Sequence, residues 1–521
     1  MRPVWRMSLL WQKARSTHSS TPISVTAPRF SAKPPMVPIW HGWQSMADTT
    51  SDRARATLGR QIRRGVSWNA ANLLVNKGMS ILVRLLLARL LLPEHFGLIA
   101  MIVVILGLVK NFVDFGLKNA LIQRKRDASS LIRYDSAFWF LLGGGIGWTL
   151  LFIVACIPLM IWFYDEPQLR ELALVMSLSI LLHSFSILPE VRLTRRMRFK
   201  SQVIAEFIST VVASGIAIAM AFAGAGVWAL AAQQLCAVGL RSAMLWRAVR
   251  LRPRRRFSWK SLRDVVGFSR WMLGTRLTDF TRANFDRVAI GALLGASSLG
   301  IYAVAFTLTE QLRSQLSQVL TRVLLPAFSR VQDNQELLRA EFFAATERIC
   351  IFIFPIAIQI YLHSESLVGV AFSSDWQDAA ELAQILSVSI MIYALSGPSP
   401  ELLIAVKKPN LVFIISLINT IFVVVPTTLV LVYIFGLSGA AYSVVISMVG
   451  IRARYLYFVN SIIIISAKKF IASLAPGVIF GLLIFLIGNF LPVQLAVWGA
   501  LFFHVLGLAV LVFIQPGRTS K

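Results

Sequence analysis

The sequence RLTDFTRANFDR, residues 276–287, decides how the rest of the chain must be read. It places five charges within twelve residues, inside a stretch, 266–294, that otherwise has the character of a membrane-spanning helix. A charge at the bilayer centre costs about 2.5–3.5 kcal/mol, so five facing lipid would cost on the order of 10 kcal/mol or more. At about 100° per residue these charges gather on one face, which holds Asp279, Arg282 and Asp286 with Arg276 and Arg287 at its edge. That face must meet water or other protein.

The composition is that of a membrane-embedded protein. Hydrophobic residues make up 56% and charged residues 15%, against roughly 45–50% and about 25% in soluble domains. The formal net charge of +28 fits either nucleic-acid binding or a set of basic cytoplasmic loops, and the positions of the charges separate the two. Three cysteines, at 156, 236 and 350, lie in apolar segments without a C-x-x-C partner, so neither a disulfide framework nor a zinc site is indicated.

Apolar segments of membrane-spanning length follow one another from residue 65 onward. We therefore predict an all-α polytopic membrane protein with about fourteen transmembrane helices, at 66–90, 96–118, 134–162, 170–190, 203–223, 226–247, 266–293, 299–325, 342–364, 379–403, 410–434, 438–460, 470–490 and 493–514. The seventh and eighth segments carry many polar groups, so a count of twelve or thirteen stays open.

The loops between these segments alternate in charge. Every second loop is basic, and the strongest, 247–263, holds eight arginine and lysine residues. The opposite loops are acidic, as at Asp165, Glu166 and Asp375. This alternation follows the positive-inside rule and predicts that both termini are cytoplasmic. It also explains the high net charge without a nucleic-acid partner.

Residues 1–60 differ from the rest of the chain. They are rich in serine, threonine, proline and arginine, and no acidic residue precedes Asp48. An organelle transit peptide has this composition. The interpretation we favour is a disordered extension or a mis-assigned start, with the true start at Met46.

Two stretches of the chain resemble each other at an offset of about 203 residues. Residues 64–100 pair with 266–303, so that Gly97 matches Gly300 and Leu90-Leu91 match Leu293-Leu294. Six predicted spans separate the copies, which indicates two six-helix lobes of the same orientation, a parallel repeat. The predicted organisation is an N-terminal lobe at 61–247, a basic cytoplasmic linker at 248–265, a C-terminal lobe at 266–460, and two additional helices with a short tail at 461–521.

Polar side chains concentrate in the first two predicted helices of each lobe. They include Lys77 and Arg84, then Lys110 and Asp114, then the 276–287 charges, then Glu310 and Arg313. We predict that these helices line a central cavity. A plainer interpretation is that adjacent opposite charges, such as Lys110–Asp114, Glu310–Arg313 and Arg282–Asp286, neutralise one another between packed helices. A net-basic cavity implies an anionic ligand, and the planar fork of arginine suits phosphate.

Sequence motifs of enzymes are missing. The chain has no G-x-x-x-x-G-K-[ST], no H-E-x-x-H, no G-x-S-x-G and no D-x-D. No predicted loop is long enough for a catalytic domain. We therefore predict a protein that is not an enzyme, with no cofactor and no metal site.

Three motifs resemble the opening of bacterial polysaccharide biosynthesis and export proteins. They are GVSW at 65–68, LARLLLPEHFGL at 87–98, and DFGL at 114–117 followed by ALIQR at 120–124. The pattern is similar to the lipopolysaccharide and colanic-acid exporter branch of the multidrug/oligosaccharidyl-lipid/polysaccharide exporter superfamily. The resemblance covers about residues 62–460.

This resemblance implies a flippase in the bacterial inner membrane that moves an undecaprenyl-diphosphate-linked oligosaccharide by alternating access of its two lobes. It implies that cavity arginines hold the diphosphate. Arg84 and Arg276 are the best matches, with Arg282, Arg287 and Lys77 behind them, and Asp279 and Asp286 orienting their arginine neighbours. Partners would be the lipid-linked oligosaccharide, membrane lipid, a polysaccharide polymerase and glycosyltransferases.

Two other functions stay open. A drug or metabolite antiporter of the same superfamily would share the two-lobe plan but would carry fewer cavity cations and an isolated acid for ion coupling. A membrane polymerase or ligase would have a large external loop with catalytic residues, which the stretch 363–379 is too short to supply.

Overall fold

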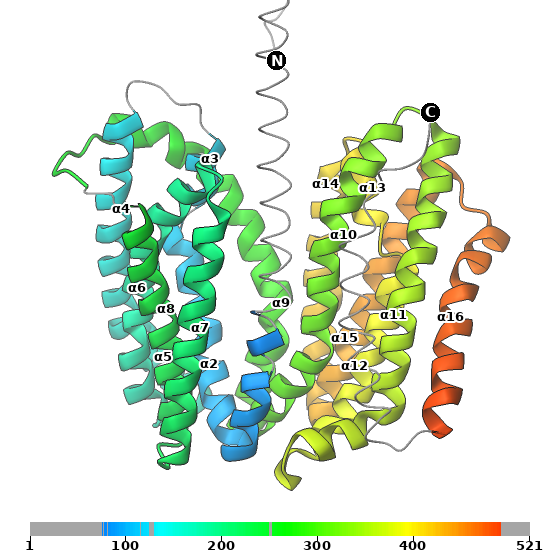
Figure 1. The fold of residues 1–521 in the computed structure, drawn as a ribbon, viewed down its shortest axis with the longest axis horizontal. Helices are drawn as coiled ribbons and strands as arrows, with labels where there is room; N and C mark the ends of the chain where they lie inside the picture. Colours follow the sequence, from blue (N-terminus) through cyan, green and yellow to red (C-terminus); the bar gives the residue numbers. More distant parts are fainter. Residues whose placement is uncertain are drawn as a thin grey trace, which may run out of the picture. The chain divides into compact units, whose positions relative to one another are not determined.

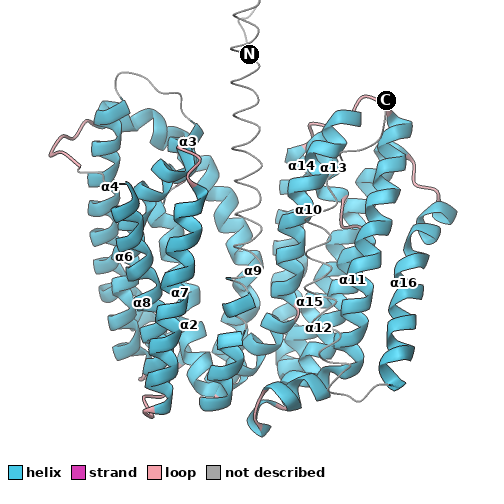
Figure 2. Ribbon diagram, viewed as in Figure 1, coloured by secondary structure: helices cyan, strands magenta, loops and turns pink. Residues whose placement is uncertain are grey.

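The structure is a computed structural model that describes residues 76–490, apart from 77, 81, 115, 124–129 and 250–252. These residues are helical throughout, with short connecting turns and no strand among them (Figure 2). Helices are expected, because a membrane-spanning backbone has to satisfy its hydrogen bonds within the segment. The 1–60 extension, Met46, Lys77 and the fourteenth predicted segment lie outside the described residues.

Helices up to residue 249 form one group (Figure 1). Helical residues at 76–90 precede α2 Pro93–Asp114, α3 Leu117–Gln123, α4 Ser130–Leu151, the π-helical segment η1 Phe152–Cys156, α5 Ile157–Tyr164, α6 Leu169–Arg195, α7 Phe199–Phe222 and α8 Val227–Val249. Helix α6 packs against α2, α4 and α8, and α7 packs against α8. We call these helices the N-terminal group.

The remaining helices form a second group, with α9 in contact with both. They are α9 Trp259–Leu308, α10 Glu310–Val331, α11 Gln335–Ala371, the 3-10 helix η2 Ser374–Trp376, α12 Asp378–Leu395, α13 Ser399–Ala405, α14 Pro409–Asn419, the π-helical segment η3 Thr420–Val424, α15 Val425–Ile463 and α16 Ala467–Phe490. Helix α11 packs against α12 and α16, and α12 packs against α15. We call α9–α16 the C-terminal group.

The described part of each predicted segment up to residue 490 is largely helical, but the boundaries differ from those predicted. The predicted helix 299–325 is interrupted at Thr309, where α9 ends and α10 begins. By length and apolar composition, eight stretches of the described residues qualify as membrane spans. The longest, Pro409–Ile463, contains a break at Gly436, whose φ of 60° is left-handed. The predicted total of fourteen is therefore not confirmed.

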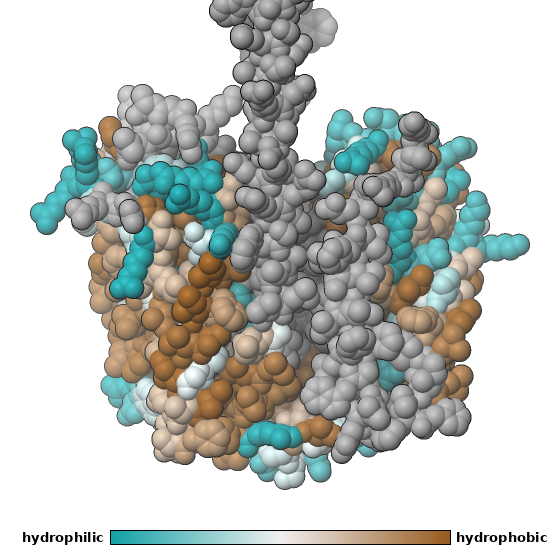
Figure 3. Space-filling view, viewed as in Figure 1, coloured by the Kyte–Doolittle hydropathy of each residue, from teal (hydrophilic) through white to brown (hydrophobic). Residues whose placement is uncertain are grey.

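The two ends of the bundle differ in charge. One end, which we call the basic end, carries the turn at Arg196–Arg198 and the connection through Arg254–Arg256. The other, the acidic end, carries Glu94 and the α5–α6 turn with Asp165 and Glu166. In Figure 3 the flank of the N-terminal group is largely brown, and teal gathers above and below it. This is the pattern of a protein whose middle faces hydrocarbon.

The repeat predicted from sequence has a direct counterpart at the acidic end. The chain leaves helical geometry at Leu91-Leu92 in the first copy and at Gly295 in the second, where a φ of 81° lets α9 turn sharply. A Cβ at Gly97 would overlap the backbone of Ala296, and a Cβ at Gly300 would overlap the backbone of Pro93. Because 93 and 97 match 296 and 300 at the 203-residue offset, the contact is reciprocal, as for two halves related by a two-fold axis.

Candidate functional site

A cavity of about 510 Å³ lies among the 76–90 helix, α2, α7, α8 and α9. Two cationic side chains line it, Arg84 from the 76–90 helix and Arg287 from α9. Arg84 precedes the helix end at residue 90, and Arg287 precedes the break at Gly295, each by about two helical turns. The cavity therefore brings together one arginine from each copy of the repeat, close to the acidic end.

Arg84 is held in the cavity by a residue of α9. Its Nη1 donates a hydrogen bond to the hydroxyl of Thr307, which also lines the cavity. The guanidinium of Arg84 lies near enough to that of Arg287 for the two charges to repel each other. Among the described side chains, no carboxylate forms an ion pair with Arg84. Its remaining N–H groups are available to an anion.

Arg287 is positioned by neutral groups. Its Nη1 donates to Asn284 Oδ1 at 3.0 Å, and its guanidinium carbon lies 4.5 Å from the centre of the Phe306 ring. Its Nε is buried and has no hydrogen-bond partner among the described residues. The adjacent Asp286 instead accepts a hydrogen bond from the buried Tyr302 hydroxyl at 2.5 Å. The Asp286–Tyr302 hydrogen bond therefore links the two parts of α9 on either side of the Gly295 break. Among the described side chains, Arg287 has no ion-pair partner.

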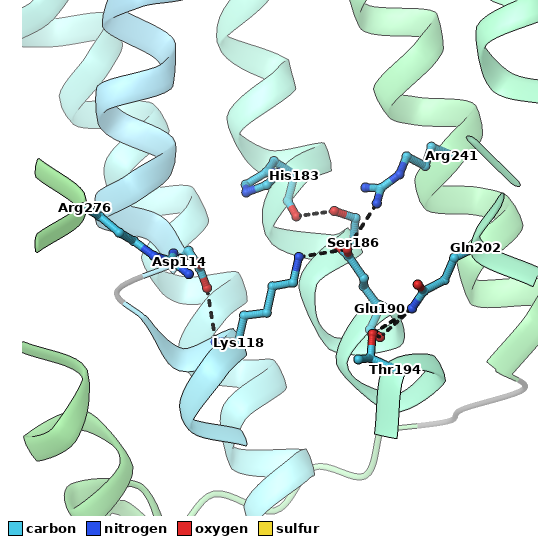
Figure 4. Close-up of polar contacts among 9 residues, drawn as sticks. All are labelled: Asp114, Lys118, His183, Ser186, Glu190, Thr194, Gln202, Arg241 and Arg276. Carbon is cyan, nitrogen blue, oxygen red and sulfur yellow. Dashed lines mark hydrogen bonds and ion pairs between the residues drawn. The ribbon is translucent and has the colours of Figure 1, made fainter. Parts of the chain in front are cut away.

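Arg276 lies elsewhere and is paired. It precedes Arg287 by eleven residues, about 16 Å along the helix, and is not among the residues that line the cavity. Its guanidinium donates to Asp114 Oδ2, the last residue of α2 (Figure 4). The sequence did not indicate this pairing, because Asp114 lies 162 residues away from Arg276 in the chain, on another helix. Asp114 is therefore paired with Arg276 and not with Lys110, its predicted partner.

A chain of charged side chains continues from this pair into the N-terminal group. Lys118 donates its backbone N–H to Asp114 at 3.2 Å and its Nζ to Glu190 at 2.8 Å. Arg241 lies 3.3 Å from the same Glu190 oxygen, as Figure 4 shows. Lys110 and His183 lie near this cluster without ion-pair partners among the described residues. Asp114, Lys118 and Glu190 thus join α2, α3, α6 and α8 to α9 near the basic end.

The remaining predicted residues belong to the C-terminal side. Arg313 and Glu310 form the predicted ion pair, with Nε 2.5 Å from Oε2, and Ser389 donates to the other oxygen of Glu310. Arg282 lies within electrostatic range of Arg313 and Asp279, not paired with Asp286 as predicted. The sequence reading missed Arg452, whose guanidinium lies 4.4 Å from the Tyr393 ring centre, although a charge in an apolar helix was a readable signal.

Further contacts at the acidic end join the two groups. Arg89 Nε donates to the Ala371 carbonyl at 2.9 Å, and its Nη2 donates to the Val370 carbonyl. These are carbonyls of the last turn of α11, which a cation stabilises. Phe96 packs edge-on against the fully buried Trp376 at 5.2 Å. Together with the Gly97 and Gly300 contact, they close this end.

The nearby acidic turn carries a perturbed carboxyl. Burial, followed by repulsion from Glu94 and Asp165, raises the pKa of Glu166. Glu166 is only partly buried, so the effect belongs to the surface of the acidic end and not to the cavity.

Comparison with known proteins identifies the class. A family described as polysaccharide biosynthesis protein matches residues 86–381, more than half of the chain. The chain belongs to this family.

Individual relatives share about a quarter of their residues with it. The lipopolysaccharide biosynthesis protein WzxC of Escherichia coli K12 is 24% identical over 436 residues, covering 79% of this chain and 83% of that protein. The succinoglycan biosynthesis transport protein ExoT of Rhizobium meliloti is 25% identical over 330 residues, covering 63% and 66%. The teichuronic acid biosynthesis protein TuaB of Bacillus subtilis is 23% identical over 305 residues, covering 58% and 62%.

Solved structures show the same fold. The lipid II flippase MurJ in an inward closed conformation matches with a TM-score of 0.69 at 14% identity, covering 84% of this chain and 96% of that one. An inward-facing multidrug resistance transporter of the MATE family, which belongs to the MOP superfamily, matches with a TM-score of 0.59 at 15% identity, covering 74% of this chain and 94% of that one. The predicted all-α, two-group architecture is thereby confirmed.

Proposed function

We propose that this protein is a flippase that carries a diphosphate-linked, lipid-anchored oligosaccharide across the bacterial inner membrane. The observation that carries the proposal is the pair Arg84 and Arg287 in one cavity, without a carboxylate paired to either among the described side chains. Two guanidinium groups that repel each other in a membrane are stabilised by an anion with several oxygens. The names of the relatives concern lipopolysaccharide, succinoglycan and teichuronic acid, which supports a polysaccharide precursor as the molecule that contains this anion.

The two sets of contacts between the groups support alternating access. The acidic end is joined by backbone packing at Gly97 and Gly300, whereas the basic end is joined by the Asp114–Arg276 ion pair. The basic loops support a cytoplasmic position of the basic end, by the positive-inside rule. In this state the cavity is closed toward the outside. Cargo enters after the ion pair separates, and leaves after the glycine contact separates.

The decisive experiment replaces each cavity arginine. Arg84→Ala and Arg287→Ala each remove charge-assisted hydrogen bonds worth about 1.5–3 kcal/mol, so binding should weaken by roughly 10- to 100-fold. The measurements are surface polysaccharide in a strain that lacks the native flippase, and binding of a polyprenyl diphosphate to the purified chain in nanodiscs. Arg84→Lys keeps the charge without the fork and should give an intermediate loss.

A matched control is Arg348→Ala. Arg348 is half exposed, lies 3.7 Å from Glu341, and is not among the cavity-lining residues. It should leave both measurements unchanged at equal protein level. Full surface polysaccharide in the Arg84→Ala, Arg287→Ala double variant would refute the cavity as the cargo site.

A second function, drug or metabolite antiport, is favoured by the likeness of the fold to the MATE transporter. The charge of the cavity opposes it for cationic drugs, since Arg84 and Arg287 repel them. Cells that express the chain should therefore gain no resistance to an organic cation such as ethidium. A resistance that depends on an acidic residue of the described bundle, such as Asp114, would favour antiport instead.

The proposed cargo also defines the setting. A lipid-linked oligosaccharide is made by glycosyltransferases on one side of the membrane and used on the other side by a polymerase or a transferase. These enzymes, together with membrane lipid, are the proposed partners, and both termini are proposed to be cytoplasmic. The chain itself is proposed to have no enzymatic activity.

A further inference from the structure

The α7–α8 wall of the cavity is polar but uncharged. Thr210 and Ser214 line it from α7, one turn apart, and Gln233 and Gln234 line it from α8. Polar groups within membrane helices are costly unless they have partners. Four in one wall of one cavity therefore require either partners in the protein or a ligand.

Partners in the protein account for part of this wall only. Gln233 Nε2 donates to Ser214 Oγ at 3.4 Å, the long limit of a hydrogen bond. Gln234 has no hydrogen-bond partner among the described residues, and its amide is not enclosed by them. An amide side chain offers two N–H donors and an oxygen with two lone pairs. The wall thus retains both donors and acceptors that face the cavity.

The chemistry of these groups specifies the ligand. A charged ligand group would call for a charged partner, which this wall lacks, whereas a hydroxyl both donates and accepts and so matches amides and hydroxyls. The cavity volume of about 510 Å³ lies in the range, roughly 300–1,000 Å³, that encloses a ligand of drug size. A diphosphate with its nearest sugar fits this scale, and a long oligosaccharide does not.

We propose that Gln233 and Gln234, supported by Thr210 and Ser214, form a subsite for the uncharged sugar attached directly to the diphosphate. This inference rests on the proposed function, because Arg84 and Arg287 hold the diphosphate in the same cavity. Specificity then resides in the first sugar, and sugars further along the chain lie outside the cavity. A site built to hydrogen-bond a hydroxyl discriminates strongly against a ligand that lacks it.

The test compares two probes on the full chain in nanodiscs. One is a polyprenyl diphosphate without sugar, and the other is the same lipid with one hexose. The wild-type chain should bind the hexose probe tighter by about tenfold, the factor expected for one or two net hydrogen bonds. Gln234→Leu, of similar size but without the amide, should reduce this preference, and the Gln233→Leu, Gln234→Leu double variant should abolish it. Binding of the bare diphosphate should stay unchanged in both.

The outcomes separate the two proposals. Equal wild-type binding of both probes overturns the sugar subsite and leaves the flippase proposal intact, and this comparison needs no variant to fold. If the wild-type chain binds neither probe, both the flippase proposal and the sugar subsite are overturned. A glutamine variant that weakens both probes equally also overturns the subsite. Gln384→Leu, on α12 and outside the cavity lining, is the control for an added apolar side chain.

Discussion

Replacing Gly97 by alanine should separate the two helical groups at the acidic end. A Cβ at this position would lie 2.9 Å from Ala296 Cα and closer still to the carbonyl of Ala296, whereas ordinary contact begins at 3.4 Å. Every atom involved is backbone, so no side chain can rotate away. The helices must move apart by at least about 0.5 Å, given those two distances.

The size of the effect follows from this overlap. Overpacking a tight contact costs about 1–3 kcal/mol. The upper part of that range applies, because both sides are backbone in helices. At 1.4 kcal/mol per factor of ten, the population with the acidic end closed should fall by about 10- to 100-fold relative to the open one. Gly300→Ala should act alike, because its Cβ would overlap the backbone of Pro93.

The assay is the distance between two spin labels at the acidic end, one in the turn at Ala225 and one at Ser373, in a variant without the three native cysteines. Gly97→Ala should shift the distribution to longer distances. Gly215→Ala is the control, since a Cβ there meets nothing within 4 Å. Equal distributions for wild type, Gly97→Ala and Gly300→Ala would refute the claim that this contact holds the end closed.

Three further outcomes are expected. Asp114→Arg should abolish transport and reduce the free energy of unfolding by about 3 kcal/mol, because it leaves Arg276 in a part-buried site without its partner. The exchanged pair, Asp114→Arg with Arg276→Asp, should recover most of this loss when thermal unfolding is measured. If the exchanged pair recovers nothing, the pairing is contradicted. Arg89→Gln should lengthen the same spin-label distance by a smaller population shift, about 1 kcal/mol, and a shift as large as that of the glycine variants would contradict this ranking. Glu166→Gln should raise the unfolding temperature at neutral pH: burial and neighbouring acids raise the pKa of the carboxyl, so its charged form destabilises the fold as pH rises through that pKa. The difference from wild type should shrink at acidic pH, and a constant difference would rule out the titration.

The helices and the repeat could be predicted from the sequence, because each depends on a pattern within a continuous stretch of residues. Apolar runs give each helix, and the matched stretches around Gly97 and Gly300 give the two copies. The reason for those glycines was not predictable, since the close backbone approach involves segments about 200 residues apart. The repeat pattern identified Gly97 and Gly300 as equivalent positions but did not indicate that they form a close backbone contact.

The sequence indicated the residue types of the candidate site, which are arginines with nearby acids, but not which of these residues are paired with one another. Helical spacing correctly gave Glu310–Arg313, where both residues lie on one helix. It ranked Arg276 above Arg282 and Arg287, because Arg276 has fewer acidic residues near it on its own helix. The structure shows other pairings: Tyr302 donates a hydrogen bond to Asp286, and Arg276 is paired with Asp114. Both partners come from tertiary packing, which the spacing of charges on a single helix does not encode.

The reciprocal contact of Gly97 with Ala296, and of Gly300 with Pro93, has the form of a homodimer interface. In such an interface each partner presents the same patch, so residue i meets j and j meets i. In this protein both patches belong to one chain, so the contact forms at a one-to-one ratio and does not depend on protein concentration. A larger residue at either glycine displaces the backbone of the other half, so neither position can change without affecting its counterpart.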